Sequence, residues 1–266
     1  MISVACYQGA PKSPLEERFA QVEEILSQTD NQKIDFLCLP EGFLTGYYEE
    51  ANHAFANCLT PGSQEFEAWL ELFKKSSTTA IVGFNELEGD KLFDSAAIIE
   101  GGRLLGVQRK HFLYHSYFTS GKHFQVYHSK NVPFGVAICL DTNYFEPARL
   151  LALQGAQIIF SPMCNKVAPT HPFATRPPYY SHFVARSFEN RLWLASADWV
   201  YPSDGSLVCP GHSAIYDPDG KEVARGQEMH SGLFSVEIPE SALYADKGRR
   251  LWGSPELFSA LLQAFI

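Results

Sequence analysis

The first part of the chain combines short apolar runs with stretches whose apolar residues recur at helical spacing. The run Ile2–Gln8 predicts a first strand, and the nearly continuous apolar run at 34–39 is typical of a strand that is buried on both faces. An amphipathic helix is predicted between them, and another over about 63–77. The apolar stripe of the first helix consists of Leu15, Phe19, Val22, Ile25 and Leu26.

The rest of the chain consists mainly of segments that predict strands, separated by turn residues. We expect strands at 79–87, 93–100 and 103–109, with a tight turn at Gly101-Gly102. Later strands are predicted at 132–138, 156–160, 192–197, 212–216, 221–225 and 232–236, with helices at about 146–154 and ending near Asn190. A pattern of about a dozen strands and four or five helices favours an α/β fold in which two sheets pack together with helices outside. Since no linker, charge block or repeat interrupts the chain, we expect one domain over residues 1–266.

Composition and charge exclude several classes of protein. A hydrophobic content of 45% in 266 residues is enough for a sizeable core. The net charge of −9 argues against binding to nucleic acid or to an anionic membrane surface, since both repel an anion. The six cysteines are scattered without a CxxC pair, which argues against a disulfide scaffold. The N-terminus lacks the features of a signal peptide, and the longest central uncharged run, 150–165, is too polar and short to span a bilayer, so we expect a soluble cytoplasmic protein.

Three polar residues follow predicted strands and are the candidates for chemistry. Glu41 comes after the buried run at 34–39, Lys110 after the strand at 103–109, and Cys139 after an apolar run that begins at Val132. The carboxyl ends of strands are where sites collect in α/β sheets. Taken singly, each residue has a simpler interpretation: a solvated glutamate, a surface lysine and a buried, inert thiol.

The sequence around these residues resembles the signature segments of the nitrilase, or carbon–nitrogen hydrolase, superfamily. Similar segments occur in the same order along almost the whole chain, which makes the resemblance specific. They are the segment 36–47 with Pro40-Glu41-Gly42, the segment 109–113 with Arg109-Lys110, the segment 135–149 with Cys139-Leu140-Asp141, and the segments 185–190 and 211–220.

The resemblance implies a four-layer αββα sandwich, a Glu41-Lys110-Cys139 triad, no metal or organic cofactor, and at least a homodimer. The chemistry is plausible on its own terms, because a thiol with an ordinary pKa of about 8.5 needs a base or a nearby cation to become a nucleophile at neutral pH. Glu41 can accept the proton, and Lys110 together with the backbone N–H of Leu140 can hold an oxyanion. The thioester formed on Cys139 would then be hydrolysed. We also expect Cys164 to line the pocket as an unreactive thiol, and Asp141 to have a supporting role.

One position departs from the family pattern. The family carries a further glutamate after the lysine, and the matching residue here is Tyr114. We therefore expect a negative charge beside Lys110 to be missing. The phenol of Tyr114 could donate a hydrogen bond, so the site would suit a substrate that offers an acceptor there. His115 is a weaker candidate for the missing role.

Four of the nine histidines lie close together, and His111 and His115 have helical metal-ligand spacing. A zinc site needs three or four ligands that lie close together in space. Because this segment is predicted to be a strand end and a loop, not a helix, we expect no metal site. Cys139 with one of these histidines would satisfy a Cys–His hydrolase of another fold, but the local cysteine context of that class is absent.

The sequence thus predicts a cysteine-dependent hydrolase that acts on a small amide or N-carbamoyl compound, because residues 40–47 are similar to the amidase branches of the family. Two alternatives stay open: a nitrilase that acts on a nitrile, and a non-catalytic or regulatory binding protein with the same fold. Lys166 and Arg176 are candidates for contact with a substrate carboxylate, although surface charge is the simpler interpretation.

Overall fold

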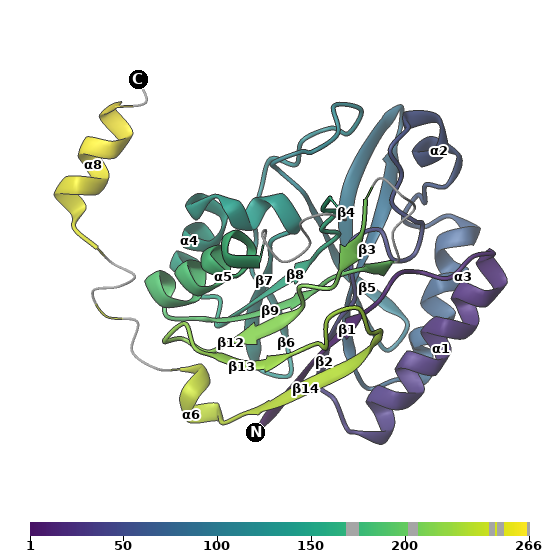
Figure 1. Cartoon of the computed structure of the whole chain (residues 1–266), viewed down its shortest axis with the longest axis horizontal. Coiled ribbons are helices and arrows are strands. Elements are labelled where there is room, and N and C mark those ends of the chain that lie inside the picture. Colours follow the sequence, from purple (N-terminus) through teal and green to yellow (C-terminus); the bar gives the residue numbers. More distant parts are fainter. Residues whose placement is uncertain (169–175, 202–206, 245–247, 249–252, 265–266) are drawn as a thin grey trace.

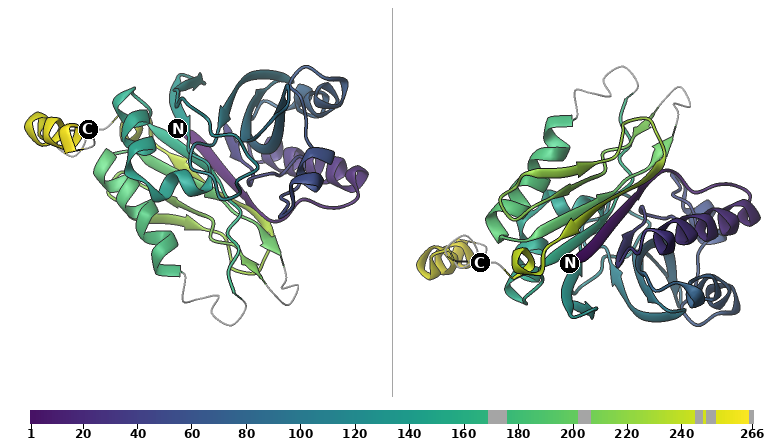
Figure 2. Two further views of the ribbon diagram at one scale, coloured as in Figure 1. Left: turned by 90° about the horizontal axis from the view of Figure 1, so that it is seen from above. Right: turned by 90° about the horizontal axis from the view of Figure 1, so that it is seen from below.

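The structure is a computed structural model that describes residues 1–168, 176–201, 207–244, 248 and 253–264, with the backbone alone for 176–180. Two six-stranded sheets lie face to face, and helices cover the outer face of each sheet (Figures 1 and 2). This order of layers is αββα, which confirms the expected fold class.

The first sheet consists of β1 (Ile2–Gln8), β2 (Phe36–Cys38), β3 (Thr79–Glu88), β4 (Lys91–Glu100), β5 (Arg103–Arg109) and β14 (Gly232–Ile238). Its strand order is β14-β1-β2-β3-β4-β5. β1, β2 and β3 are parallel, and the other pairs are antiparallel. The predicted strands of the β3–β5 meander are confirmed to within two residues. Gly101 and Gly102 form the turn with φ angles of 55° and 72°, which glycine adopts without strain.

The second sheet consists of β6 (Tyr127–Ser129), β7 (Val132–Val136), β8 (Ile158–Pro162), β9 (Trp193–Ala197), β12 (Ala214–Tyr216) and β13 (Glu222–Arg225). Its strand order is β13-β12-β9-β8-β7-β6, with β7, β8 and β9 parallel. A separate two-stranded pair, β10 (Val200–Tyr201) and β11 (Cys209–Pro210), was not predicted. The two sheets therefore have the same arrangement: three central parallel strands, flanked by antiparallel strands.

Helices pack through their apolar stripes on the outer faces. α1 (Leu15–Asn31) and α3 (Gln64–Leu72) cover the first sheet, and a 3-10 turn at Phe73–Lys75 extends α3. α4 (Phe145–Leu153) and α5 (Arg176–Asn190) cover the second sheet. Three further helices were not predicted: α2 (Ala51–Ala56), α6 (Glu240–Leu243) and α8 (Pro255–Ala264). α8 stands apart from the body of the molecule, and none of its described residues is buried (Figure 1).

The largest cluster of buried residues fills the space between the two sheets. At its centre, Phe36 of the first sheet meets Phe134 and Phe160 of the second, with ring centroids 5.4 and 5.6 Å away. This apolar layer fixes one sheet against the other and so sets the positions of the loops at the strand ends. Among the described residues, no helix has the length and apolar character needed to cross a membrane.

Candidate active site

Glu41 lies in a tight turn that follows β2. The backbone N–H of Glu41 donates to the carbonyl of Met163. The backbone carbonyl of Glu41 accepts a hydrogen bond from the indole N–H of Trp199 at 2.7 Å. The turn rests directly on Gly83 of β3: a Cβ added there would lie 2.4 Å from the backbone N of Gly42. The turn can therefore approach the strand only because residue 83 has no side chain. The Glu41 side chain is fully buried.

Lys110 follows β5 and is also buried. Its ammonium donates to Oε1 of Glu41, and to Oδ2 of Asp94 at 2.9 Å. Its backbone N–H donates to the carbonyl of Asp94 at 2.8 Å. Burial alone would lower the pKa of Lys110, but the charges of Asp94 and Glu41 outweigh it and raise the pKa well above its ordinary value. The lysine is therefore a permanent cation held between two carboxylates.

Cys139 comes three residues after the end of β7 and opens a 3-10 turn, Cys139–Asn143. Its φ of 44° lies in the left-handed region, an unfavourable conformation for a residue with a side chain. The Asp141 carboxylate accepts hydrogen bonds from the backbone N–H groups of Ile138, His111 and Phe112, at 3.1, 3.1 and 2.9 Å. Asp141 thus ties the cysteine turn to the segment that follows Lys110, in agreement with the supporting role predicted for it.

Cys139 lines a pocket of about 150 Å³. The predicted residues Tyr114, Leu140 and Cys164 lie in its wall, as do four residues that the sequence did not single out for this role: Tyr47, Asn143, Met163 and Asn165. Lys166 completes the lining. Glu41 and Lys110 do not line this pocket, but they contact each other, and the charges of both act on the Cys139 thiol.

The electrostatics of the site favour a neutral thiol and a basic carboxylate. Burial and then the charge of Glu41 raise the pKa of Cys139 well above its ordinary value, while Lys110 and the backbone N–H of Cys164 lower it. Burial and then the charge of Asp94 raise the pKa of Glu41, against the effect of Lys110. The Glu41 carboxylate is therefore more basic than an ordinary glutamate, and the Cys139 thiol is harder to ionise than an ordinary cysteine.

Asp94 corrects one expectation from the sequence. The negative charge expected to be missing beside Lys110 is present, because Asp94 supplies it from the middle of β4. Tyr114 is 73% exposed, and its ring meets that of His115 edge-on with centroids 4.9 Å apart. The available signal in the sequence was an aspartate inside a predicted strand that is mainly apolar.

Charged side chains also line the pocket's rim. The ammonium of Lys166 pairs with Glu49 and lies 4.7 Å from the centroid of the Tyr47 ring. Nε2 of His115 is 3.7 Å from the same Glu49. Lys166, a candidate for contact with a substrate carboxylate, therefore already has an acidic partner, and the side chain of Arg176 lies outside the described residues.

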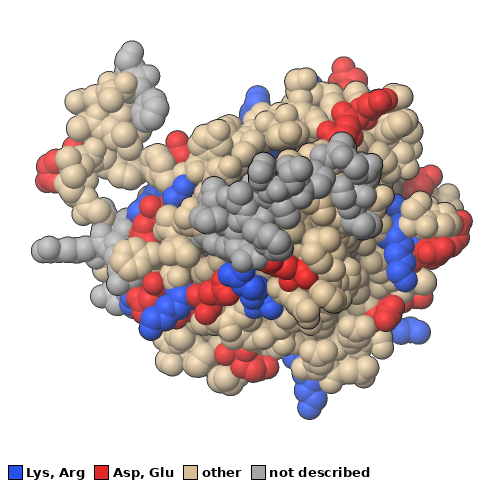
Figure 3. Space-filling model, in the orientation of Figure 1, with Lys and Arg blue, Asp and Glu red and all other residues tan. Residues whose placement is uncertain are grey.

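His111 is one of the four histidines that lie close together in the sequence. Nδ1 of His111 is 2.6 Å from the carbonyl of Gly121, which occupies one of its ring nitrogens. Within the part of the chain that the structure describes, no three histidine, cysteine, aspartate or glutamate side chains are grouped as metal ligands would be. On the face drawn in Figure 3, lysines and arginines lie among acidic residues and form no continuous basic patch.

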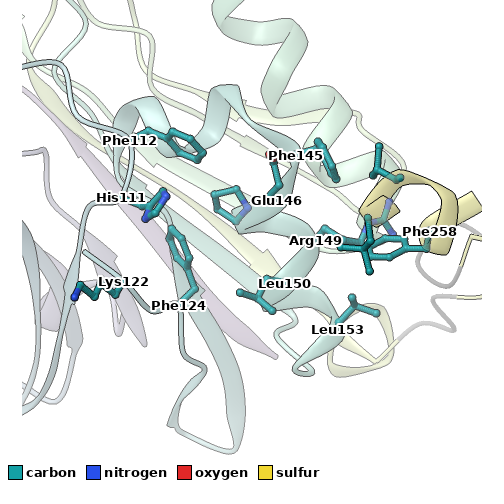
Figure 4. A pocket seen from close by; sticks show the side chains of 13 residues that line it. His111, Phe112, Lys122, Phe124, Phe145, Glu146, Arg149, Leu150, Leu153 and Phe258 are labelled. Atoms are coloured by element: carbon teal, nitrogen blue, oxygen red, sulfur yellow. The ribbon is translucent and has the colours of Figure 1, made fainter. Parts of the chain in front are cut away.

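A larger pocket of about 480 Å³ lies between α4 and α8 (Figure 4). Its wall is mainly apolar, with Phe124, Leu150 and Phe258 among the side chains that point into it. Glu41, Lys110 and Cys139 are not part of its lining. Its size therefore does not make it the candidate for catalysis.

Comparisons with known proteins show the family and the fold of the chain. The family model described as carbon-nitrogen hydrolase matches residues 3–247. The chain is 27% identical over 266 residues to a protein from Pyrococcus abyssi named nitrilase, covering 97% of this chain and 96% of that one. It is 30% identical over 291 residues to the N-carbamoylputrescine amidase of Solanum lycopersicum, covering 98% and 95%. The crystal structure of a carbon-nitrogen hydrolase from Helicobacter pylori G27 superposes with a TM-score of 0.86 at 21% identity, over 98% of this chain and 97% of that one, and so has the same fold.

Proposed function

Because the chain belongs to the carbon–nitrogen hydrolase family, we propose that it hydrolyses a small non-peptide amide or N-carbamoyl compound, with Cys139 as nucleophile. Glu41 is the general base and Lys110 the cation that stabilises negative charge. The observation that carries the proposal is the buried Glu41–Lys110 ion pair beside a cysteine that opens onto a small pocket.

In the first half of the reaction, Glu41 takes the proton of the Cys139 thiol as the sulfur attacks the carbonyl carbon. Oε2 of Glu41 has no hydrogen-bond partner among the described residues, so it can receive this proton while Oε1 stays bound to Lys110. The C–S bond forms and the carbonyl oxygen becomes an oxyanion, which the Lys110 ammonium and the N–H of Leu140 stabilise. Glu41, now protonated, gives its proton to the nitrogen as the C–N bond breaks, so ammonia or an amine leaves and a thioester remains.

The second half repeats the proton transfers with water. Glu41 removes a proton from a water molecule, and the resulting hydroxide attacks the thioester carbon. The C–S bond breaks, the proton on Glu41 returns to sulfur, and the carboxylic acid product leaves. Every step uses one base and one fixed cation, which is what the buried cluster provides.

Two observations support small amides as the substrate class. The pocket volume of about 150 Å³ admits a compact substrate. A relative from Solanum lycopersicum, matched over 98% of this chain and 95% of its own length, is named N-carbamoylputrescine amidase. The Pyrococcus abyssi relative is named a nitrilase, so nitriles belong in the same panel of test compounds.

The proposal is tested by hydrolysis of that panel and by iodoacetamide labelling followed by peptide mass mapping. We expect the parent protein to release ammonia from at least one small amide or N-carbamoyl compound and to be labelled at Cys139. Cys139→Ala should lose turnover completely, because Cys139 is the thiol on which the charges of both Glu41 and Lys110 act. Cys58→Ala is the matched control and should keep full activity, because Cys58 packs against a separate cluster around Ala54 and Leu92 and does not line the pocket.

Each other result has a definite meaning. Turnover that survives in Cys139→Ala overturns the mechanism. Saturable binding of an amide with no turnover and no acyl adduct indicates the non-catalytic binding protein. Turnover confined to nitriles keeps the nucleophile and corrects the substrate class.

The proposal also includes assembly as a homo-oligomer through α8. The exposed side chains of this helix are large and apolar: Leu257, Phe258, Leu261 and Leu262. On α4, Leu150 and Leu153 are exposed in the same way and line the pocket that faces α8. A second copy of the chain is the occupant that offers the same apolar surface in return.

A further inference from the structure

Asp94 holds Lys110 at both ends. Its main-chain carbonyl accepts the N–H of Lys110 at 2.8 Å, and Oδ2 of its side chain accepts the ammonium of the same lysine at 2.9 Å. Asp94 itself is buried in β4, where Ser95, the next residue, is paired with Arg109 of β5. A lysine side chain has four flexible methylene groups, and fixing both of its ends removes most of that freedom.

We propose that Asp94 is a positioning residue of this site, which fixes the Lys110 ammonium against Glu41 and keeps Glu41 basic enough to deprotonate Cys139. This inference rests on the proposed function. Asp94 acts through Lys110 and Glu41, because its carboxylate binds the Lys110 ammonium, which in turn binds Glu41.

The charge balance of the cluster supports this role. Glu41 and Asp94 are two buried carboxylates that share one cation, and the charge of Asp94 disfavours ionisation of Glu41. After burial, the charge of Asp94 is the largest influence that raises the pKa of Glu41, and Lys110 acts in the opposite direction. Without Asp94, the charge of Lys110 would act on Glu41 unopposed by a second carboxylate, and Glu41 would bind a proton more weakly.

The groups that face Glu41 come from several elements. They are Asp94 of β4, Lys110 after β5, Tyr47 in the loop after β2, Tyr117 in the loop after Lys110, Cys139 after β7 and Cys164 after β8. Among these described neighbours, Asp94 is the one carboxylate. Its removal is therefore the change that alters the proton affinity of Glu41 without removing the base, the cation or the nucleophile.

The test compares Asp94→Asn with Asp90→Asn, which removes the same charge from an exposed residue in the turn before β4. We expect Asp94→Asn to lower kcat at least tenfold, with KM changed by less than about threefold, because a weaker base slows proton transfer but leaves the pocket intact. The acid limb of kcat/KM against pH should move to lower pH, since Glu41 must be ionised to act and loses a neighbour that favoured its protonation. Asp90→Asn should match the parent protein.

The outcomes separate this inference from the proposed function. If the parent protein shows no turnover and no labelling of Cys139 by iodoacetamide, the proposed function fails. If the parent is active and Asp94→Asn keeps both its rate and its acid limb, Asp94 is not a positioning residue. A lower rate with an unmoved acid limb means a merely structural role and also overturns the inference. Asp94→Ser, which keeps a hydroxyl for the lysine, is the second variant, and loss of the fold in both would assign Asp94 to structure alone.

Discussion

At the scale of single residues, the two oxygens of Glu41 have different surroundings. Oε1 accepts the ammonium of Lys110, and Oε2 has no hydrogen-bond partner among the described residues. A buried carboxylate oxygen without a partner is costly, so it marks a position that structure alone does not require. The two oxygens therefore have different roles: Oε1 fixes the orientation of the carboxylate, and Oε2 stays available for a proton.

The raised pKa of Glu41 leads to a prediction about pH. The base must be ionised before the reaction, and burial together with Asp94 raises its pKa above the ordinary value for glutamate. Activity should therefore be lost on the acid side at a pH clearly above the ordinary glutamate pKa of about 4.3. The measurement is kcat/KM for the best amide against pH, with circular dichroism at each pH to show that the fold persists. An acid limb at or below the ordinary value would contradict the assignment of Glu41 as a buried base.

The sequence could single out Glu41, Lys110 and Cys139 as candidates, because each follows a recognisable strand within a distinctive segment. It could not predict Asp94, whose importance comes from a contact between neighbouring strands β4 and β5. The sequence of residues 93–100 predicts a strand but does not reveal which functional group lies next to Asp94. The same limit explains Tyr114, which aligns with a family glutamate although another residue supplies the charge.

At the scale of elements, the contact between β3 and the Glu41 turn is the tightest feature of the site. Gly83→Ala would place a methyl group 2.4 Å from the backbone N of Gly42 and 2.6 Å from Cα of Glu41. Since these are backbone atoms, the turn must move. We expect a loss of stability of about 1–3 kcal/mol and a fall in kcat of at least tenfold, measured by chemical denaturation and by steady-state turnover.

Gly232→Ala is the matched control for that variant. Gly232 is also a strand residue, at the start of β14, and an added Cβ would meet nothing within 4 Å. It should leave turnover unchanged and stability equal or slightly higher. Equal kcat values in both variants would show that the Glu41 turn tolerates displacement.

The prediction of strands succeeded where the apolar segments were long and were separated by clear turn residues, as in the β3–β5 meander with its Gly-Gly turn. It failed for short elements such as α2, β10 and β11, which have too few residues to establish a period. β7 ends at Val136 although an apolar strand was predicted as far as residue 138. The difference arises because the chain leaves the sheet to present Cys139 in its left-handed conformation.

At the scale of the whole molecule, the exposed apolar face of α8 predicts association. We expect the parent protein to sediment as a dimer or larger species, and the double variant Leu257→Glu/Leu262→Glu to shift towards the monomer, because burying two carboxylates in an apolar contact is unfavourable. Sedimentation velocity over a range of concentrations measures this. Leu15→Glu, a change of an exposed leucine at the start of α1, is the control and should leave the assembly unchanged. A monomeric parent protein would refute the prediction.

The candidate triad is divided between the two sheets. Glu41 and Lys110 extend from strands of the first sheet, and Cys139 extends from the second, so the site exists only while the apolar layer around Phe36 and Phe134 holds the sheets together. Neither sheet carries all three residues by itself. Substitutions deep in that layer, remote from any substrate, should therefore lower turnover, and turnover becomes a measure of how well one half of the molecule is docked on the other.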